Sequence, residues 1–294
     1  MKHGQAYSGM RHRFSPFDIL VYGSMLASFL LCIIPFLYMY AISLSDVRAI
    51  LNNQVGLWPN GFNTAAYETI FRFPNFFLAY RNTIFYTTFG TSIALFLTVL
   101  FAYPLSKAFL RVNKVLLKFV VFSMFFSGGL IPTFLLIANL GLINTPFAII
   151  IPFAINPFNL IIMISFFRGV PSEIEEAALI DGMGYYGILF RIVLPLSTAA
   201  LATIGLYYAV FFWNDWFNAL IYLRSAQFPV MLFLRNIVNG TMMIGEGAGS
   251  AEGNSLGIAI KAAVIIVSTL PIIILYPFLQ RFFIAGLTLG SVKG

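Results

Sequence analysis

Six apolar runs, each long enough to cross a lipid bilayer, constrain the fold of this 294-residue chain more than any other feature. A bilayer core about 30 Å thick requires roughly 20 apolar residues per helix. The runs lie near 18–44, 79–107, 115–138, 146–167, 196–222 and 259–284. Because lipid offers the backbone no hydrogen-bond partners, each run is expected to form a helix. The sequence therefore predicts an all-α membrane protein with six transmembrane helices.

The composition excludes several classes of protein. Hydrophobic residues make up 60% of the chain and charged residues only 9%, which does not suit a water-soluble globule. Cys32 is the only cysteine, and His3 and His12 lie in the N-terminal arm, so the spans lack residues for a disulfide framework, a metal site or a Ser-His hydrolase. The basic residues are scattered singly and indicate no nucleic-acid partner. No Gly-x-x-x-x-Gly-Lys-Ser/Thr loop occurs, so the chain is expected to bind no nucleotide itself, and no catalytic activity is expected of it.

Lysine and arginine are distributed unevenly over the loops, and this bias predicts the orientation of the chain in the plasma (inner) membrane. Eleven of the seventeen basic residues fall on the side that carries both termini, which is therefore expected to be cytoplasmic. The chain is interpreted as one transmembrane domain, 1–294. Its parts outside lipid are an N-terminal cytoplasmic arm 1–17, a cytoplasmic loop 168–195, an external loop 223–258 and a cytoplasmic tail 285–294.

The loop 168–195 carries the densest group of acidic residues in the chain and must lie outside lipid. Ser172 followed by Glu175 has the spacing of a capping box, so a short helix is expected to begin at Ser172. Gly182 permits a sharp turn into a second short helix. The pattern predicts a rigid helix-turn-helix that could fit a partner's groove; an ordinary amphipathic helix between two spans is the alternative.

Several positions in this loop match a known motif. Glu176-Ala177-Ala178 is followed by Gly182, then by Ile192 and by Leu194-Pro195. This spacing resembles the signature loop of permeases from binding-protein-dependent ABC importers. The six runs are similar to the second permease of maltose-type (CUT1) carbohydrate importers, with the resemblance closest to permeases for complex and acidic oligosaccharides. The resemblance implies a type I ABC importer fold and a coupling helix that docks on an ATPase through Glu176, Ala177, Ala178, Asp181 and Gly182.

The resemblance also implies partners: a second paralogous permease, an ABC ATPase dimer that binds ATP and Mg, an extracytoplasmic solute-binding protein and a sugar. The C-terminus resembles the tail with which maltose-type second permeases reach into the ATPase dimer interface, although Leu289 and Ser291 stand where small residues are commoner. A disordered tail is the alternative. The candidate interface residues are Ser291, Val292, Lys293 and Gly294.

Polar side chains inside a span are costly and usually face a cavity or a partner, so they mark a candidate transport path. Amides and a carboxylate offer partners to sugar hydroxyls, and indole rings suit the apolar faces of pyranoses. Helical spacing would place Asp215 beside Asn218 and would give Trp213 and Trp216 another edge. The alternative is an aromatic belt with Asp215 paired to an arginine such as Arg224. The candidate path residues are Asn156, Asn159, Trp213, Asn214, Asp215, Trp216 and Asn218.

Two segments are expected outside the membrane. Residues 45–78 contain turn signals and a short helical pattern, which predicts an ordered platform beneath a binding protein. Residues 223–258 are too long for a simple turn, and the resemblance implies a loop that probes the sugar-binding protein; a flexible connector is the alternative.

The expected function is import of a carbohydrate, an oligosaccharide, driven by a separate ATPase. An importer of another polar solute, such as an amino acid or phosphate, is the alternative within transport. An intramembrane enzyme is the alternative from another class, and it would need a clustered catalytic pair that this sequence does not show.

Overall fold

The computed structural model describes residues 16–107, 109–239, 256–274 and 277, and most of these residues are helical. Three helices are each long and apolar enough to span a membrane: α1 (Pro16–Ser43), α4 (Phe76–Ser106) and the helix Leu256–Ile274. Three further pairs of helices reach that length together but are bent at a break. Counting each bent pair as one span gives up to six spans, which confirms the predicted all-helical membrane fold.

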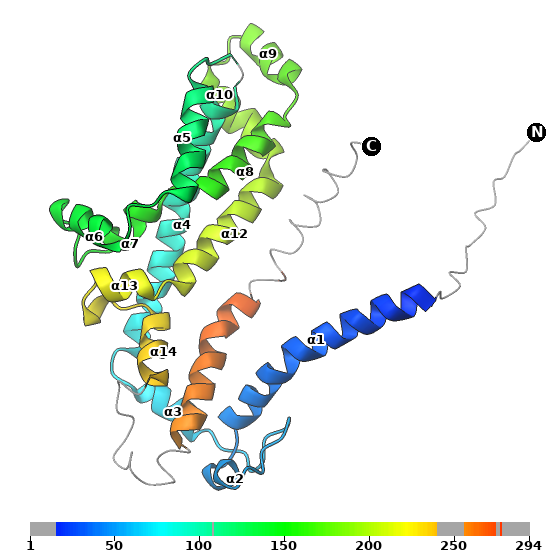
Figure 1. The fold of residues 1–294 in the computed structure, drawn as a ribbon, viewed down its shortest axis with the longest axis vertical. Helices are drawn as coiled ribbons and strands as arrows, with labels where there is room; N and C mark the ends of the chain where they lie inside the picture. The colour runs from blue at the N-terminus through cyan, green and yellow to red at the C-terminus, as the bar shows by residue number, and fades with distance from the viewer. Residues whose placement is uncertain (1–15, 108, 240–255, 275–276, 278–294) are drawn as a thin grey trace, which may run out of the picture. The chain divides into compact units, whose positions relative to one another are not determined.

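The chain divides into two compact units (Figure 1). The first comprises residues 1–67 and 247–266, and its described part holds α1 and α2 (Val47–Leu51). After α1 the chain folds back on itself: Ser45 and Phe62 form an isolated antiparallel bridge, and the Asn60 N–H donates to Ser45 Oγ at 3.0 Å. These bonds make the region after the first span ordered, as expected, while its place outside the membrane stays a prediction.

The second unit comprises residues 68–246 and 267–294, and three of its helices, α4, α8 and α12, pack against one another (Figure 1). The helix α3 (Ala65–Arg72) crosses the boundary between the two units. The elements after α4 are α5 (Asn113–Phe125), α6 (Leu130–Asn139), α7 (Phe147–Ile150), η1 (Ile151–Phe153), α8 (Pro157–Arg168), α9 (Ser172–Ile180), α10 (Tyr185–Ile188), the π-helical turn η2 (Leu189–Val193), α11 (Leu194–Leu196), α12 (Thr198–Asn214), α13 (Phe217–Tyr222), η3 (Ser225–Gln227) and α14 (Val230–Val238).

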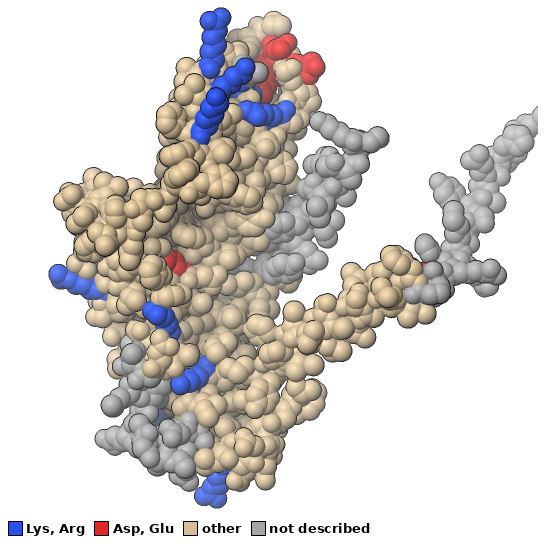
Figure 2. Space-filling model, viewed as in Figure 1, with Lys and Arg blue, Asp and Glu red and all other residues tan. Residues whose placement is uncertain are grey.

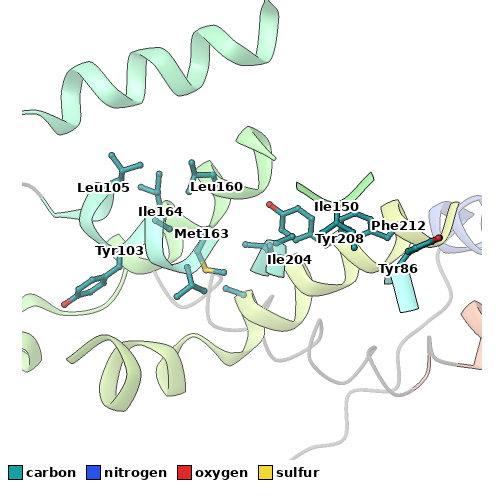
Figure 3. Close-up of a cluster of buried hydrophobic side chains, with 14 of the residues drawn as sticks. Tyr86, Tyr103, Leu105, Ile150, Leu160, Met163, Ile164, Ile204, Tyr208 and Phe212 are labelled. Atoms are coloured by element: carbon teal, nitrogen blue, oxygen red, sulfur yellow. The ribbon is translucent and has the colours of Figure 1, made fainter. Parts of the chain in front are cut away.

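The packed helices meet in a core of buried side chains, part of which is shown in Figure 3. Small residues let the helices approach closely, as is common between membrane helices. A Cβ at Gly90 of α4 would lie only 2.9–3.0 Å from the Phe212 ring of α12. The buried hydroxyl groups of Thr98 and Tyr208 share a hydrogen bond of 2.7 Å, so this polar pair is satisfied within the core. The core therefore fixes α12 firmly against α4.

Three predicted runs are not single helices in the part of the chain that the structure describes. In the run 146–167, the segments Phe147–Phe153 and Pro157–Arg168 are separated by a short break and differ in direction by 49°. In the run 115–138, α5 and α6 are separated by a short break and differ in direction by 116°. Gly129 lies in this break with a φ of +83°, a conformation that side chains other than hydrogen disfavour. In the run 196–222, α12 ends at Asn214, and Asp215 has an extended backbone. The expectation of one continuous helix through each run is wrong, because apolar composition gives the length of a span without giving the position of a break.

Candidate coupling site and transport path

The helices α9 and α10 form the helix-turn-helix predicted for the loop 168–195, at one end of the second unit (Figure 1). The first of them begins at Ser172, as expected, directly after Pro171. Gly182 ends it with a φ of +81°. The Gly182 N–H donates to the Leu179 carbonyl at 3.0 Å and the Met183 N–H to the Ala178 carbonyl at 2.9 Å, which is the Schellman arrangement of a left-handed glycine cap. The turn is thus fixed by a backbone conformation that glycine adopts without strain.

One face of α9 is exposed to solvent in the described part of the chain and carries most of the motif residues. Glu176, Ala177 and Asp181 are exposed, and Ile180 on the same helix is 86% exposed. Ala178 is buried and points into the fold rather than outward. Figure 2 shows Lys and Arg atoms gathered beside Asp and Glu atoms at this end of the second unit. An exposed isoleucine between two carboxylates is a suitable contact for a partner protein.

The predicted capping box at Ser172 does not form. Ser172 is the first helical residue, and the residue before it makes no side-chain cap. The Glu175 carboxylate instead binds Lys107, which follows the last residue of α4, with both oxygens 2.5 Å from Nζ. The Tyr103 hydroxyl donates to the same carboxylate at 3.2 Å, and the Lys107 ammonium lies 4.4 Å from the centre of the Tyr103 ring. Glu175 therefore forms a tertiary ion pair with Lys107 and makes no capping interaction within α9.

A cavity of about 930 Å³ opens next to this ion pair. Its walls come from the end of α4, the start of α5, the end of α8 and the inner face of α9. Lys107 and Glu175 lie in its wall, together with Arg111, Lys114 and Arg168. The cavity means that α9 is not seated on a dense apolar core along its length.

The two predicted path clusters are separate sites in the structure. Asn156 caps α8: its Oδ1 accepts the Phe158 N–H at 2.9 Å, and its own N–H donates to Tyr208 Oη at 3.0 Å. Asn159 is buried within α8. Within the described ranges, no hydrogen bond joins either amide to the cluster at Asp215.

Asp215 and Asn218 are neighbours, but the predicted reason is wrong because no helix runs through both. Asp215 Oδ1 accepts both the backbone N–H of Asn218, at 3.1 Å, and its side-chain amide, at 3.0 Å. This is how an aspartate caps the start of a helix, here α13. Asp215 is 8% exposed, and its Oδ2 is buried without a hydrogen-bond partner among the residues that the structure describes. The alternative pairing with Arg224 is not seen among those residues either.

The two tryptophans of the cluster occupy different environments rather than one shared edge. Trp213 is buried, and its Nε1 donates to the Ser268 carbonyl at 3.3 Å. Trp216 lies under the Arg235 guanidinium, 3.7 Å from the ring centre. Asn214 is exposed, and its amide bonds back to the Val210 carbonyl within α12. Trp213 is thus a packing residue, while Trp216 with Arg235 forms a polar and aromatic surface.

Comparison with known proteins places this architecture in a family. No protein-family model matches the chain. It is 43% identical to the polygalacturonan/rhamnogalacturonan transport system permease protein YtcP of Bacillus subtilis (strain 168), over 95% of this chain and 98% of that protein. It is 31% identical to the inner membrane ABC transporter permease protein YcjP of Escherichia coli (strain K12), over 92% of this chain and 94% of that protein. The chain belongs to the carbohydrate ABC importer permeases of the maltose (CUT1) type.

A solved structure supports the same assignment for the fold of this permease. The crystal structure of a bacterial ABC transporter involved in the import of the acidic polysaccharide alginate contains a chain with a TM-score of 0.85 and 35% identity. The match covers 92% of this permease and 99% of that chain. The type I importer fold is therefore confirmed, and the permease is a multi-pass membrane subunit that carries no catalytic activity itself.

Sequence reasoning missed the ion pair that holds α9 of this permease. In the sequence, Lys107 contributes only to the charge bias of the loops, and Glu175 only to the spacing of a capping box. A lysine placed directly after a span and a glutamate beside the motif are the available signals, but nothing in a single sequence joins two residues 68 positions apart. The predicted tail contacts at Ser291, Val292, Lys293 and Gly294, and the segment Gly240–Gly253 of the external loop, lie outside the described residues.

Proposed function

We propose that this permease forms half of the membrane pathway of a binding-protein-dependent importer for acidic oligosaccharides, and that α9 is the helix that docks on its ATPase. The observation that carries the proposal is the exposed face of α9, where Glu176, Ala177 and Asp181 surround a solvent-facing Ile180 next to a glycine-capped turn. Because ABC importer permeases work with an ATPase, a groove on that ATPase is the proposed binding site for this face.

The proposed mechanism is alternating access. An extracytoplasmic binding protein delivers the sugar, and a second, paralogous permease forms the other half of the pathway. An ATPase dimer binds ATP and Mg, closes, and moves α9. Because ATP is cytoplasmic, α9 must face the cytoplasm, and six spans would then place both termini on that side. In this proposal the tail 291–294 reaches the ATPase, and the loop 223–258 contacts the binding protein.

Two observations support an acidic sugar as the substrate. Two relatives are named for polygalacturonan/rhamnogalacturonan transport and for alginate import. In this chain, Arg235 stacks on Trp216 close in sequence to the Asp215–Asn218 turn, and no ion pair of Arg235 is seen within the described residues. A guanidinium on an aromatic face can bind a uronate carboxylate while the indole contacts the sugar ring. Asp215 Oδ2 is buried and has no hydrogen-bond partner among the described residues, so it can accept a hydrogen bond from a sugar hydroxyl.

The docking part of the proposal is tested by co-purification of the full complex with an Ile180→Ser variant. We expect this variant to lose the ATPase subunit while keeping the second permease, because Ile180 contributes surface to docking and none to the fold of this chain. Val112→Ser is the matched control, since Val112 is 61% exposed near the same end of the unit but lies outside α9. Equal ATPase recovery with both variants would contradict docking through α9.

The substrate part is tested by ATP hydrolysis in the reconstituted complex with its binding protein. Acidic uronide oligosaccharides should stimulate hydrolysis more than neutral oligosaccharides of equal length, and an Arg235→Gln variant should reduce that preference. Stimulation by an amino acid or by phosphate instead would support the alternative transport substrate, and ATP-driven efflux would contradict import.

A further inference from the structure

The chain connections of α9 do not by themselves fix its orientation. At its start, Gly169, Val170 and Pro171 separate it from α8. At its end, the turn contains Gly182 and Gly184. A glycine in a connection between helices can absorb backbone rotation and act as a hinge. The Schellman turn holds the end of α9, but rotation at Gly169 can still absorb part of a force applied to α9, so full transmission to another helix needs a direct contact.

The Lys107–Glu175 ion pair is such a contact. The pair is short and uses both carboxylate oxygens, and the side chains are 14% and 10% exposed. Charge-assisted hydrogen bonds of this kind are stronger and more directional than contacts between neutral groups. Tyr103, one helical turn before Lys107, adds a third hydrogen bond to the same carboxylate. Glu175 is thus held from two positions on α4.

The helix at the other end of this contact is central to the unit. Figure 3 shows Tyr103 beside the core side chains of α8, and Tyr103 packs edge-on against Phe167 at 6.3 Å between ring centres. The end of α4 is itself fixed, because the Asn113 amide donates to the Lys107 carbonyl at 2.6 Å and to the Pro104 carbonyl at 2.8 Å. A displacement of Lys107 is therefore a displacement of α4 and of the helices packed on it.

The apolar packing of α9 on the unit is slight in comparison. Only Glu175 and Ala178 are buried on this helix, and the 930 Å³ cavity lies along its inner face. The ion pair spans one edge of that cavity, where side-chain packing cannot replace it. Its position between the docking helix and the central span distinguishes it from a surface salt bridge, which would contribute little.

We propose that the Lys107–Glu175 pair is a strut that transmits the movement of α9 to α4, with Glu175 as a positioning residue for energy coupling. The inference rests on the proposed docking of α9 on the ATPase. Movement of the docking helix would reach α8 and α10 through their covalent connections. The inference adds that it also reaches α4, through a contact between side chains.

The test uses the complete complex in lipid vesicles, with four readouts: ATPase recovery, basal hydrolysis, hydrolysis stimulated by the loaded binding protein, and sugar imported per ATP. We expect Glu175→Gln and Lys107→Met to retain the ATPase and its basal rate. Sugar imported per ATP should fall about tenfold, a typical size for a coupling between two sites. Arg111→Met is the matched control, because it removes an exposed cation from the wall of the same cavity and should leave coupling unchanged.

Rescue separates a strut from a merely stabilising pair. Lys107→Arg should keep coupling, and the exchanged pair Lys107→Glu with Glu175→Lys should recover most of it. In a Cys32→Ser background, the Lys107→Cys and Glu175→Cys variant, with its two thiols joined by a short bifunctional reagent, should restore coupling without any charge. This covalent arm also covers the case in which the single variants assemble poorly.

The outcomes are distinct. Unchanged import per ATP in Glu175→Gln, or no recovery in the cross-linked protein, would overturn the strut. A wild-type complex that fails to recover an ATPase, or that is not stimulated by any loaded binding protein, would instead contradict the proposed function on which the strut rests.

Discussion

Gly182 offers a sharp test of the proposed coupling through α9, because its substitution isolates one physical effect. Its φ is +81°, and a Cβ built on it would meet nothing within 4 Å among the residues that the structure describes. A side chain at this position therefore costs backbone strain and no steric clash. Left-handed backbone costs an L-residue about 1–2 kcal/mol, and β-branched residues are the least tolerant.

The strain can be converted into an expected loss of activity. A cost of 1–2 kcal/mol changes an equilibrium by a factor of about 5–30. If the full penalty falls on the docking-competent turn, Gly182→Ala should lower uptake per complex by about that factor. Gly182→Val should lower it further, to near abolition, whereas Gly182→Asn should remain close to wild type because asparagine tolerates the left-handed region.

Gly184 is the matched control for this series. It lies two residues further along the same turn, with a φ of −74° and open space around its Cβ position. Gly184→Val should therefore show near wild-type uptake when transport, expression and complex assembly are measured together. Equal uptake in Gly182→Val and Gly184→Val would refute the strain argument, and wild-type uptake in Gly182→Val at normal expression would refute the coupling role of the turn.

Two further predictions concern the core and the path. Gly90→Ala should destabilise the permease by about 1–3 kcal/mol, because its Cβ would overlap the Phe212 ring at 2.9 Å. The control is Gly205→Ala, whose Cβ would meet its nearest neighbour at an ordinary 3.7 Å. The melting temperature of the purified complex should fall in the first variant and stay unchanged in the second. Asp215→Asn should alter uptake or sugar preference while the complex stays assembled, because it removes the charge and keeps the shape; normal uptake per complex and unchanged preference in both Asp215→Asn and Asn218→Ala would exclude this face from the path.

The predictions that the structure confirms depend on local chemistry. The spans follow from the length of the apolar runs, since lipid leaves the backbone no other means of satisfying its hydrogen bonds. The start of α9 at Ser172 follows from Pro171, and its end follows from the freedom of Gly182. In each case the residues that decide the structure are adjacent in the sequence.

The predictions that are wrong depend on partners distant in the sequence or on breaks within apolar runs. Glu175 has the spacing of a cap, but Lys107 binds its carboxylate more closely than a backbone N–H would. Hydropathy predicts one helix that runs to residue 222, but α12 ends at Asn214. The next residue, Asp215, has an extended backbone, and its side chain accepts a hydrogen bond from the first turn of α13. The Asn-Asp pair at 214–215 is a recognised helix-start signal and could have located that break; no local signal could have located Lys107 as the partner of Glu175.

The absence of a side-chain cap affects how α9 is held in the fold. A helix of nine residues is marginally stable alone, and α9 lacks the side-chain cap that would help it. Part of its order comes from the Schellman turn at Gly182, and part from the ion pair to α4. The carboxylate that could have stabilised α9 locally instead joins it to a span, which links the helix that would meet the ATPase to the helix that it would move. Because the Schellman turn does not involve Glu175, a variant that breaks the ion pair should lose the link to α4 and keep the docking helix folded.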